Sequence, residues 1–354
     1  MNFGIKDLLK LFISLGLAVG LLWLFFRYSG IRIDEIGERF QQADYRFVLL
    51  SVALAILAHW SRAMRWRMLM EPVGYRPTGL NAYLAVLTGY FANTLVPRLG
   101  EVTRCGTLNR LERVPVNVSF GTVVAERIID VLMLLVLLAA TFVLEFNRLS
   151  TFFIDFFTTK FGGSGTAAGD GSGGAAVLLY AVGAFVGLVL LVWVLFSRFK
   201  DTLRQKPAYQ KLATFLGGLV QGLTSVRRLR RPGGFLFHTA LIWTLYYLMG
   251  YVLFFAVPET SGLGPLAGLT ILVVGAIGMT TPTPGGTGSF QILVGSVLVL
   301  YGLESKDGGL LATFVWAVQT LTVLIIGGLA FVVVLLKSGK QPAPAPAEAL
   351  TDKP

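Results

Sequence analysis

The stretch 281-TPTPGGTGSFQ-291 interrupts an apolar part of the chain and decides how that part can fold. Apolar runs flank it at residues 266–279 and 292–301, and each is shorter than the roughly 20 residues that a helix needs to cross a hydrocarbon core. Proline removes a backbone donor and glycine loosens a helix, so peptide groups here lack helical partners. Because lipid cannot satisfy such groups, we expect the stretch to face protein or a water-filled cavity.

The composition is typical of a polytopic membrane protein. Of 354 residues, 55% are hydrophobic and only 14% are charged, and the mean hydropathy is +0.71. These values argue against a water-soluble enzyme. The net charge of +11 comes from Lys and Arg in loops beside apolar runs, which indicates membrane topology and contact with anionic headgroups rather than nucleic acid. One cysteine and two histidines provide neither an intrachain disulfide nor a structural zinc site, and we expect no metal or cofactor.

The hydrophobic runs predict an all-α protein with about six full transmembrane helices. A second interruption, 93-NTLVPRLGEVTR-104, follows the apolar run at residues 80–96 and resembles the first in combining proline and glycine. We interpret both interrupted regions as re-entrant hairpins. The six full spans are expected at residues 8–26, 47–60, 119–146, 176–196, 235–257 and 310–336.

Charge in the loops predicts the orientation. Residues 197–232 contain nine Lys or Arg against one acid, so this connection should be cytoplasmic. With six spans, both termini are then cytoplasmic in a multi-pass protein of the plasma (inner) membrane. The two hairpins enter from opposite sides, as an inverted repeat would give. Residues 1–337 form one transmembrane domain, and the Pro/Ala-rich tail at 338–354 is expected to be disordered.

The first interruption concentrates polar and charged residues. If a helix restarts after Gly100, Glu101 and Arg104 lie one turn apart and can pair, which leaves Arg98 free for an anion. Asn93 precedes them at the break. The alternative is a cytoplasmic loop whose charges serve topology alone.

A second cluster, Glu126, Arg127 and Asp130, lies inside the expected span at residues 119–146. Glu126 and Asp130 share a helix face through their spacing of four. Charges at such depth are costly, so they pair or line a polar pathway. A purely structural triad, neutralised by Arg98 or Arg104, is the alternative.

The opening stretch offers uncharged polar groups. Exposed amides after Gly285 and Gly286, with the positive end of the helix that follows, make an anion seat to which Thr283 and Gln291 can contribute. A structural kink without a ligand is the alternative.

Arg62 and Arg65 lie three residues apart and can meet a lipid phosphate from one helix face. Snorkelling to the interface explains them as well, and we favour it. For His59 and His238 we expect a packing role rather than a proton relay.

No motif for ATP hydrolysis, serine hydrolase or zinc protease chemistry is visible. We therefore do not expect an enzyme, and transport would be downhill or coupled to a gradient.

Four segments in order, 61-SRAMRWRMLM-70, 93-NTLVPRLGEVTRC-105, 125-AERIIDVLMLL-135 and the opening stretch, resemble the transmembrane region of lysylphosphatidylglycerol synthases. The resemblance covers residues 8–337 and implies a flippase-like fold that moves lipid between leaflets. In the bifunctional synthases a separate soluble domain makes the lipid, and this chain is expected to lack that domain. Gln291 is a departure, because an acid is expected there in related sequences.

The leading hypothesis is a lipid translocator that shields a polar or phosphate-bearing headgroup between the two hairpins. Its partners would be anionic or aminoacylated phospholipids or a polyprenyl-phosphate lipid, with a homo-oligomer left open. Arg98 and Arg104 would contact phosphate, with Glu101, Glu126 and Asp130 balancing charge or binding a cationic headgroup. Two alternatives stay open: a secondary transporter of a small anion, and a membrane transferase acting on a lipid-phosphate substrate.

Overall fold

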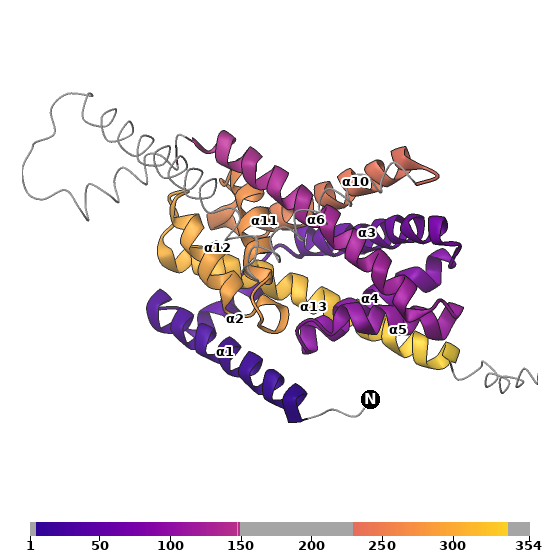
Figure 1. Cartoon of the computed structure of the whole chain (residues 1–354). Helices are drawn as coiled ribbons and strands as arrows, with labels where there is room; N and C mark the ends of the chain where they lie inside the picture. Colours follow the sequence, from indigo (N-terminus) through magenta and orange to yellow (C-terminus); the bar gives the residue numbers. More distant parts are fainter. Residues whose placement is uncertain (1–4, 147, 149–228, 339–354) are drawn as a thin grey trace, which may run out of the picture.

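The described residues form an all-α protein. The computed structural model describes residues 5–146, 148 and 229–338, and this part of the chain contains helices and turns but no strand (Figure 1). The α-helices are α1 (Ile5–Ser29), α2 (Ile33–Gln42), α3 (Tyr45–Met70), α4 (Gly79–Leu95), α5 (Gly100–Glu112), α6 (Val116–Leu144), α10 (Pro232–Tyr251), α11 (Pro265–Met279), α12 (Ser289–Val299) and α13 (Ser305–Ser338). Short 3-10 turns are η1 (Glu71–Val73), η3 (Val252–Ala256), η4 (Pro258–Thr260) and η5 (Pro284–Gly286).

Four helical segments are long and apolar enough to cross a membrane: Tyr45–Val73, Val116–Leu144, Pro232–Ala256 and Ser305–Lys337. They coincide with four of the six expected spans. The expected first span lies in α1, which passes the same test only together with α2, across a bend of 83°. The expected span at residues 176–196, most of the basic loop and the tail lie outside the described residues. The described residues therefore contain four candidate spans, or five if the bent pair counts as one.

The first interrupted region is a helical hairpin of α4 and α5. Glu112, at the end of α5, accepts hydrogen bonds at 3.0 Å from the Thr78 amide and at 2.7 Å from the Asn81 side chain, at the start of α4. The two helices touch through glycines: a Cβ atom on Gly100 would lie 2.5 Å from the Gly89 carbonyl oxygen. The hairpin therefore begins and ends at the same end of the bundle.

The second interrupted region, α11 and α12, has the same form. The hydroxyl groups of Thr270 and Tyr301 lie 2.6 Å apart, which joins the start of α11 to the residues after α12. A Cβ atom on Gly275 would lie 2.7 Å from the Phe290 ring, so α11 can approach α12 only because this position is glycine. The break itself contains η5, where Gly285 and its neighbours turn the chain.

The order of elements repeats. A long helix, a hairpin and a second long helix occur first as α3, α4–α5 and α6, and again as α10, α11–α12 and α13. The corresponding long helices α3 and α10 pack against each other and run antiparallel: Ser51 donates to the Met249 carbonyl at 2.7 Å, and Ser61 lies 2.8 Å from the His238 ring. The contacts between the halves are reciprocal, because α4 packs on α13 and α11 packs on α6. This is the arrangement that an inverted repeat requires.

The two hairpins therefore start at opposite ends of α3. α4 follows the end of α3 through η1, whereas α11 follows α10, whose end lies at the start of α3, where the Asp44 amide donates to the Ala256 carbonyl at 2.8 Å. Their tips meet: a Cβ atom on Gly285 would lie 3.6 Å from the Thr94 methyl group. Re-entrance into the membrane from the two sides stays a prediction that this geometry favours.

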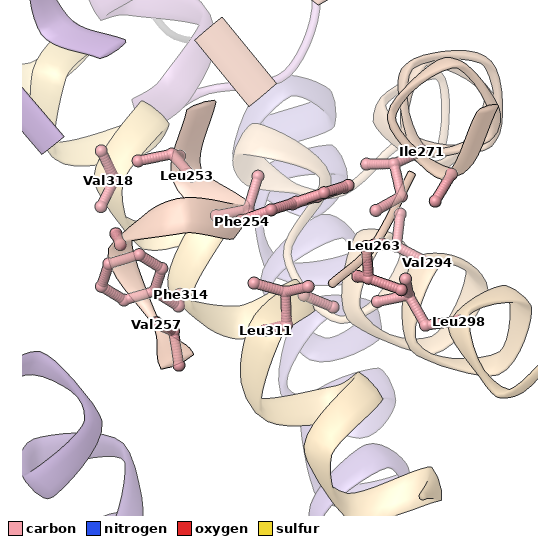
Figure 2. Packing of buried hydrophobic residues seen from close by; sticks show 14 of the residues in the cluster. Leu253, Phe254, Val257, Leu263, Ile271, Val294, Leu298, Leu311, Phe314 and Val318 are labelled. Carbon is pink, nitrogen blue, oxygen red and sulfur yellow. The ribbon is translucent and has the colours of Figure 1, made fainter. Parts of the chain in front are cut away.

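An apolar cluster holds the second half together. Figure 2 shows Phe254 of η3 among side chains of α11, α12 and α13, including Leu298, Leu311 and Phe314. Within a bilayer, such packing is stabilised by close van der Waals contact rather than by removal of apolar surface from water. This packing fixes the hairpin of α11 and α12 against α13. The hairpin tip, η5, then lies against α4.

Substitution at the glycine contact tests the first hairpin. We expect Gly100→Ala to lower the melting temperature of the purified protein, because its methyl group would meet the Gly89 carbonyl, and overpacking costs about 1–3 kcal/mol. The matched control is Gly106→Ala in the same helix, where no atom lies within 4 Å of the added group. Equal melting temperatures for both variants would contradict the close approach.

Cysteine labelling tests the opposite arrangement of the hairpins. In a Cys105→Ala background, Val73→Cys reports the end from which α4 starts and Ser261→Cys the end from which α11 starts; both positions are exposed. We expect a membrane-impermeant maleimide to label Ser261→Cys in intact cells and Val73→Cys only after lysis. Labelling of both in intact cells would rule out hairpins that enter from opposite sides.

Candidate functional site

A cavity of about 520 Å³ lies where the two hairpin tips approach the long helices. Its wall is largely apolar with a limited set of polar groups, which is the usual character of a ligand site. The polar, charged and aromatic lining residues include Ser51, His59, Arg62, Tyr90, Asn93, Thr94, Arg98, Glu101, Arg127, Asp130, Trp243, Tyr246, Tyr247, Thr280, Thr281, Thr283, Trp316, Gln319, Thr320 and Thr322.

Behind one wall of this cavity, Glu126 is fully buried and bound by two arginines. The Arg62 Nε donates to Glu126 Oε1 at 2.8 Å, and Arg104 donates to Oε2 at 2.9 Å. A single carboxylate at such a place would carry a large desolvation cost, which arginine N–H groups offset. Both oxygens of Glu126 are therefore engaged within the protein.

Asp130, one turn along α6, extends the same network to the cavity surface. Its two oxygens accept from Arg62 and from Arg65, each at 2.6 Å. Arg62 thus bridges both carboxylates, and it also donates to the Tyr246 hydroxyl at 3.0 Å. Arg62 and Asp130 line the cavity.

Helix spacing explains why these groups converge. Glu126 and Asp130 are four residues apart on α6, and Arg62 and Arg65 are three apart on α3, so each pair lies on one helix face. From α5, the Arg104 guanidinium lies 3.7 Å from the centre of the Trp66 ring, a cation–π contact that holds it towards Glu126. The network joins α3, α5 and α6.

The charges in and around the cavity are unequal. Within the described part of the chain, three buried arginines face the two carboxylates of the network. Arg127 pairs with Glu101 at 3.5 Å on the cavity side, and Arg98 is exposed and forms no ion pair with any described residue. The surplus of positive charge favours an anion in the cavity.

The favoured interpretation of Arg62 and Arg65 as snorkelling residues is wrong. Their side chains are 4% and 0% exposed and bind the carboxylates of α6 instead of reaching the interface. The reason is a long-range pairing, since these partners lie more than 60 residues away along the chain. Arg62 lines the cavity, whereas Arg65 acts behind its wall.

The expected pair of Glu101 and Arg104 is also wrong. Arg104 is buried against Glu126, while Glu101 lies by Arg127 at the cavity. The fully buried carboxylate needs a cation more than the half-exposed Glu101 does. Arg104 neutralises Glu126 of the second cluster, while Arg127 and Asp130 of that cluster line the cavity.

Arg98 lies at the tip of the first hairpin. It adopts a left-handed backbone conformation (φ 66°), which is rare for a residue with a side chain. The Asn93 side chain stabilises this turn by accepting from the Arg98 amide at 2.7 Å. Both residues line the cavity, as the expected anion site requires.

The second hairpin contributes Thr283, Gly285 and Gly286 to the cavity, but not Gln291. Gln291 is buried, and its side-chain oxygen accepts from the Gly288 amide at 2.8 Å, so it caps the start of α12. It lies instead at a smaller cavity of about 260 Å³ beside α1. Sequence spacing did not show this, because the position of Gln291 depends on where α12 begins, which is Ser289.

Sequence reasoning missed most of the aromatic wall. Trp243 and Tyr246 of α10 line the cavity one turn apart, and Tyr90 of α4 lies opposite, 3.3 Å from the Tyr246 hydroxyl. His59 also lines it, although it was expected only to pack. The available signal was a row of amphipathic aromatic residues in the middle of an apolar helix, away from the interfaces where they usually gather.

The fold and the site define a polytopic α-helical membrane protein with a positively charged internal cavity. The chain belongs to the family described as the lysylphosphatidylglycerol synthase TM region, whose family model matches residues 9–327. This confirms the resemblance found in the sequence motifs.

Two relatives are UPF0104 membrane proteins of archaea. The protein of Methanocaldococcus jannaschii is 31% identical over 117 residues, which cover 32% of this chain and 35% of the relative. The protein of Pyrococcus horikoshii is 22% identical over 321 residues, which cover 84% of this chain and 88% of the relative. No solved structure matches the chain.

Substitution of Glu126 tests how much the buried network contributes to the stability of the protein. We expect Glu126→Gln to destabilise the protein by about 3–5 kcal/mol, because it leaves buried arginines without their counter-charge, measured as thermal unfolding in detergent. The control Glu259→Gln removes a 48% exposed partner of Arg39 and should cost less than about 1 kcal/mol. A Glu126→Gln protein as stable as this control would show that the network is dispensable for folding.

Proposed function

We propose that the protein is a lipid translocator whose central cavity shields a phosphate-bearing headgroup while the lipid tails stay in the bilayer. The observation that carries this proposal is the surplus of arginine over carboxylate at a cavity that lies between two interrupted helical hairpins. Arginine N–H groups match phosphate oxygens in pairs, which makes arginine the preferred residue for such a ligand.

The cavity would lower the free-energy cost of moving a headgroup through the hydrocarbon core. A charged headgroup pays a large desolvation penalty in hydrocarbon, and a wall that supplies fixed counter-charges and hydrogen bonds reduces that penalty. Interrupted helices are suited to this task, because their free peptide groups must face such a cavity rather than lipid. The family description, which refers to a lipid synthase, supports a lipid as the ligand.

The remaining parts of the proposal follow from the sequence. The protein would reside in the plasma (inner) membrane with both termini cytoplasmic. Its lipid would be an anionic or aminoacylated phospholipid, or a polyprenyl phosphate. Both hairpins would then present the cavity to the two leaflets in turn, as inverted repeats do in transporters.

The test is lipid movement in reconstituted vesicles. Proteoliposomes containing fluorescent phosphatidylglycerol are treated with dithionite, which bleaches only the outer leaflet, and movement is measured as loss of the protected fraction. We expect loss faster than in protein-free vesicles. Phosphate or chloride flux without lipid movement would instead support an anion transporter, and a change in lipid mass would support a transferase.

Substitution of Arg98 tests whether the cavity, rather than the general surface charge, is needed for lipid movement. We expect Arg98→Asn to reduce lipid movement at least tenfold, because it removes a cation of the first hairpin tip that has no ion pair among the described residues. Asparagine tolerates the left-handed conformation, so folding should not suffer. Arg113→Asn is the matched control: Arg113 is also exposed and left-handed (φ 56°) but lies outside the cavity. Equal loss in both variants would contradict a role for the tip.

A further inference from the structure

We infer that the headgroup carried is a phosphate ester of a neutral, hydroxyl-bearing group, such as a polyol or a sugar, and not an amino-bearing cationic headgroup. This inference rests on the proposed function, because it names the substrate class of the same cavity. Three features of the cavity wall support it: the state of its carboxylates, a set of polar atoms without partners, and its aromatic side chains.

The carboxylates at the cavity are already engaged. Both oxygens of Asp130 accept arginine N–H groups at 2.6 Å, and Glu101 pairs with Arg127 at 3.5 Å. Within the described residues, these two are the only carboxylates that line the cavity. An ammonium group entering it would meet arginines of the same charge before it met an unpaired acid, which disfavours an aminoacylated or ethanolamine headgroup.

Three buried polar atoms of the cavity wall have no hydrogen-bond partner among the described residues. They are His59 Nδ1 on α3, Trp243 Nε1 on α10 and Thr283 Oγ1 at the second hairpin tip. A buried group left in this state lowers stability, so each requires an explanation. A ligand that supplies their partners is the explanation that the position of all three at one cavity favours.

The chemistry of the three atoms suits hydroxyl or phosphate oxygens and, at Trp243, not an ammonium. The indole N–H of Trp243 only donates, the Thr283 hydroxyl donates and accepts, and the imidazole of His59 does either, depending on its tautomer. An ammonium cannot accept from Trp243. A hydroxyl group does both, so a ligand with several hydroxyl groups satisfies all three.

Trp243 lies beside the charged network in the cavity wall. Trp243 and Tyr246 are one turn apart on α10 with ring centres 6.1 Å apart, and Tyr246 accepts a hydrogen bond from Arg62 of the charged network. The aromatic wall continues with Tyr247 and Trp316. Such side chains combine an apolar face with a polar edge, which suits a ring or chain that alternates C–H and O–H groups.

Binding selectivity tests the inference. The purified full chain in detergent is titrated with lipids, and binding is measured as the increase in melting temperature. Phosphatidic acid provides the bare phosphate, phosphatidylglycerol and phosphatidylinositol add hydroxyl groups, and lysylphosphatidylglycerol adds a cation. Polyprenyl phosphate with and without one hexose distinguishes a sugar from a polyol source. We expect the hydroxylated lipids to bind at least fivefold tighter than phosphatidic acid, and lysylphosphatidylglycerol to bind more weakly than phosphatidylglycerol.

Two conservative variants test whether Trp243 and Thr283 cause the preference for hydroxylated lipids. Trp243→Phe keeps the ring but removes the donor, and Thr283→Val keeps the shape but removes the hydroxyl. Each should reduce the preference for hydroxylated lipids at least threefold while leaving phosphatidic acid binding within twofold. Trp60→Phe and Thr141→Val, outside the cavity, should leave the preference unchanged.

The outcomes separate this inference from the proposed function. Equal binding of phosphatidic acid and hydroxylated lipids, or tighter binding of lysylphosphatidylglycerol, would overturn the inference even if the vesicle assay shows lipid movement. Selective binding that depends on Trp243 and Thr283, without lipid movement, would support the inference and overturn translocation. An unchanged preference in both variants would also overturn it.

Discussion

The buried carboxylate of Glu126 is the constraint on which the rest of the structure depends. With its side chain fully enclosed, it requires cations at both oxygens, and Arg62 and Arg104 supply them from two other helices. Breaking such a buried pair costs more than the pair itself contributes, because the remaining charge is left without compensation. The network therefore fixes the relative positions of α3, α5 and α6, and so the wall of the cavity.

The hairpins depend on a second constraint, the close approach of backbones. Gly89 and Gly100 allow α4 and α5 to touch, and Gly275 does the same for α11 and Phe290 of α12. Close packing of short helices keeps their interrupted ends inside the protein, where the free peptide groups find partners. The Gly285 carbonyl, for example, accepts from Trp316 of α13 at 2.7 Å. The tips can thus meet inside the bundle without exposing backbone to lipid.

Much of this architecture could be predicted from the sequence, because its causes are local. The length of the apolar runs predicted the long helices, and the proline and glycine residues between shorter runs predicted the two hairpins. The partners of the charges could not be predicted, since Arg62 and Glu126 are 64 residues apart and only tertiary packing brings them together. The prediction for Gln291 failed for a different reason: as the third residue of α12, it accepts from the Gly288 amide at the start of its own helix instead of facing the cavity.

In the proposed function, the division between buried and exposed arginines would let one cavity both attract and release a headgroup. The buried arginines are held by short contacts to Glu126 and Asp130, so they provide a fixed positive field that needs no rearrangement when a ligand arrives. Arg127, with a side chain 44% exposed and its partner Glu101 at 3.5 Å, is held less firmly, and Arg98 has no ion pair among the described residues. In the proposed function, direct contact with phosphate therefore falls to these two residues. Because exposed ion pairs contribute little energy, the contact between Arg127 and Glu101 would add little to the cost of binding and releasing a phosphate.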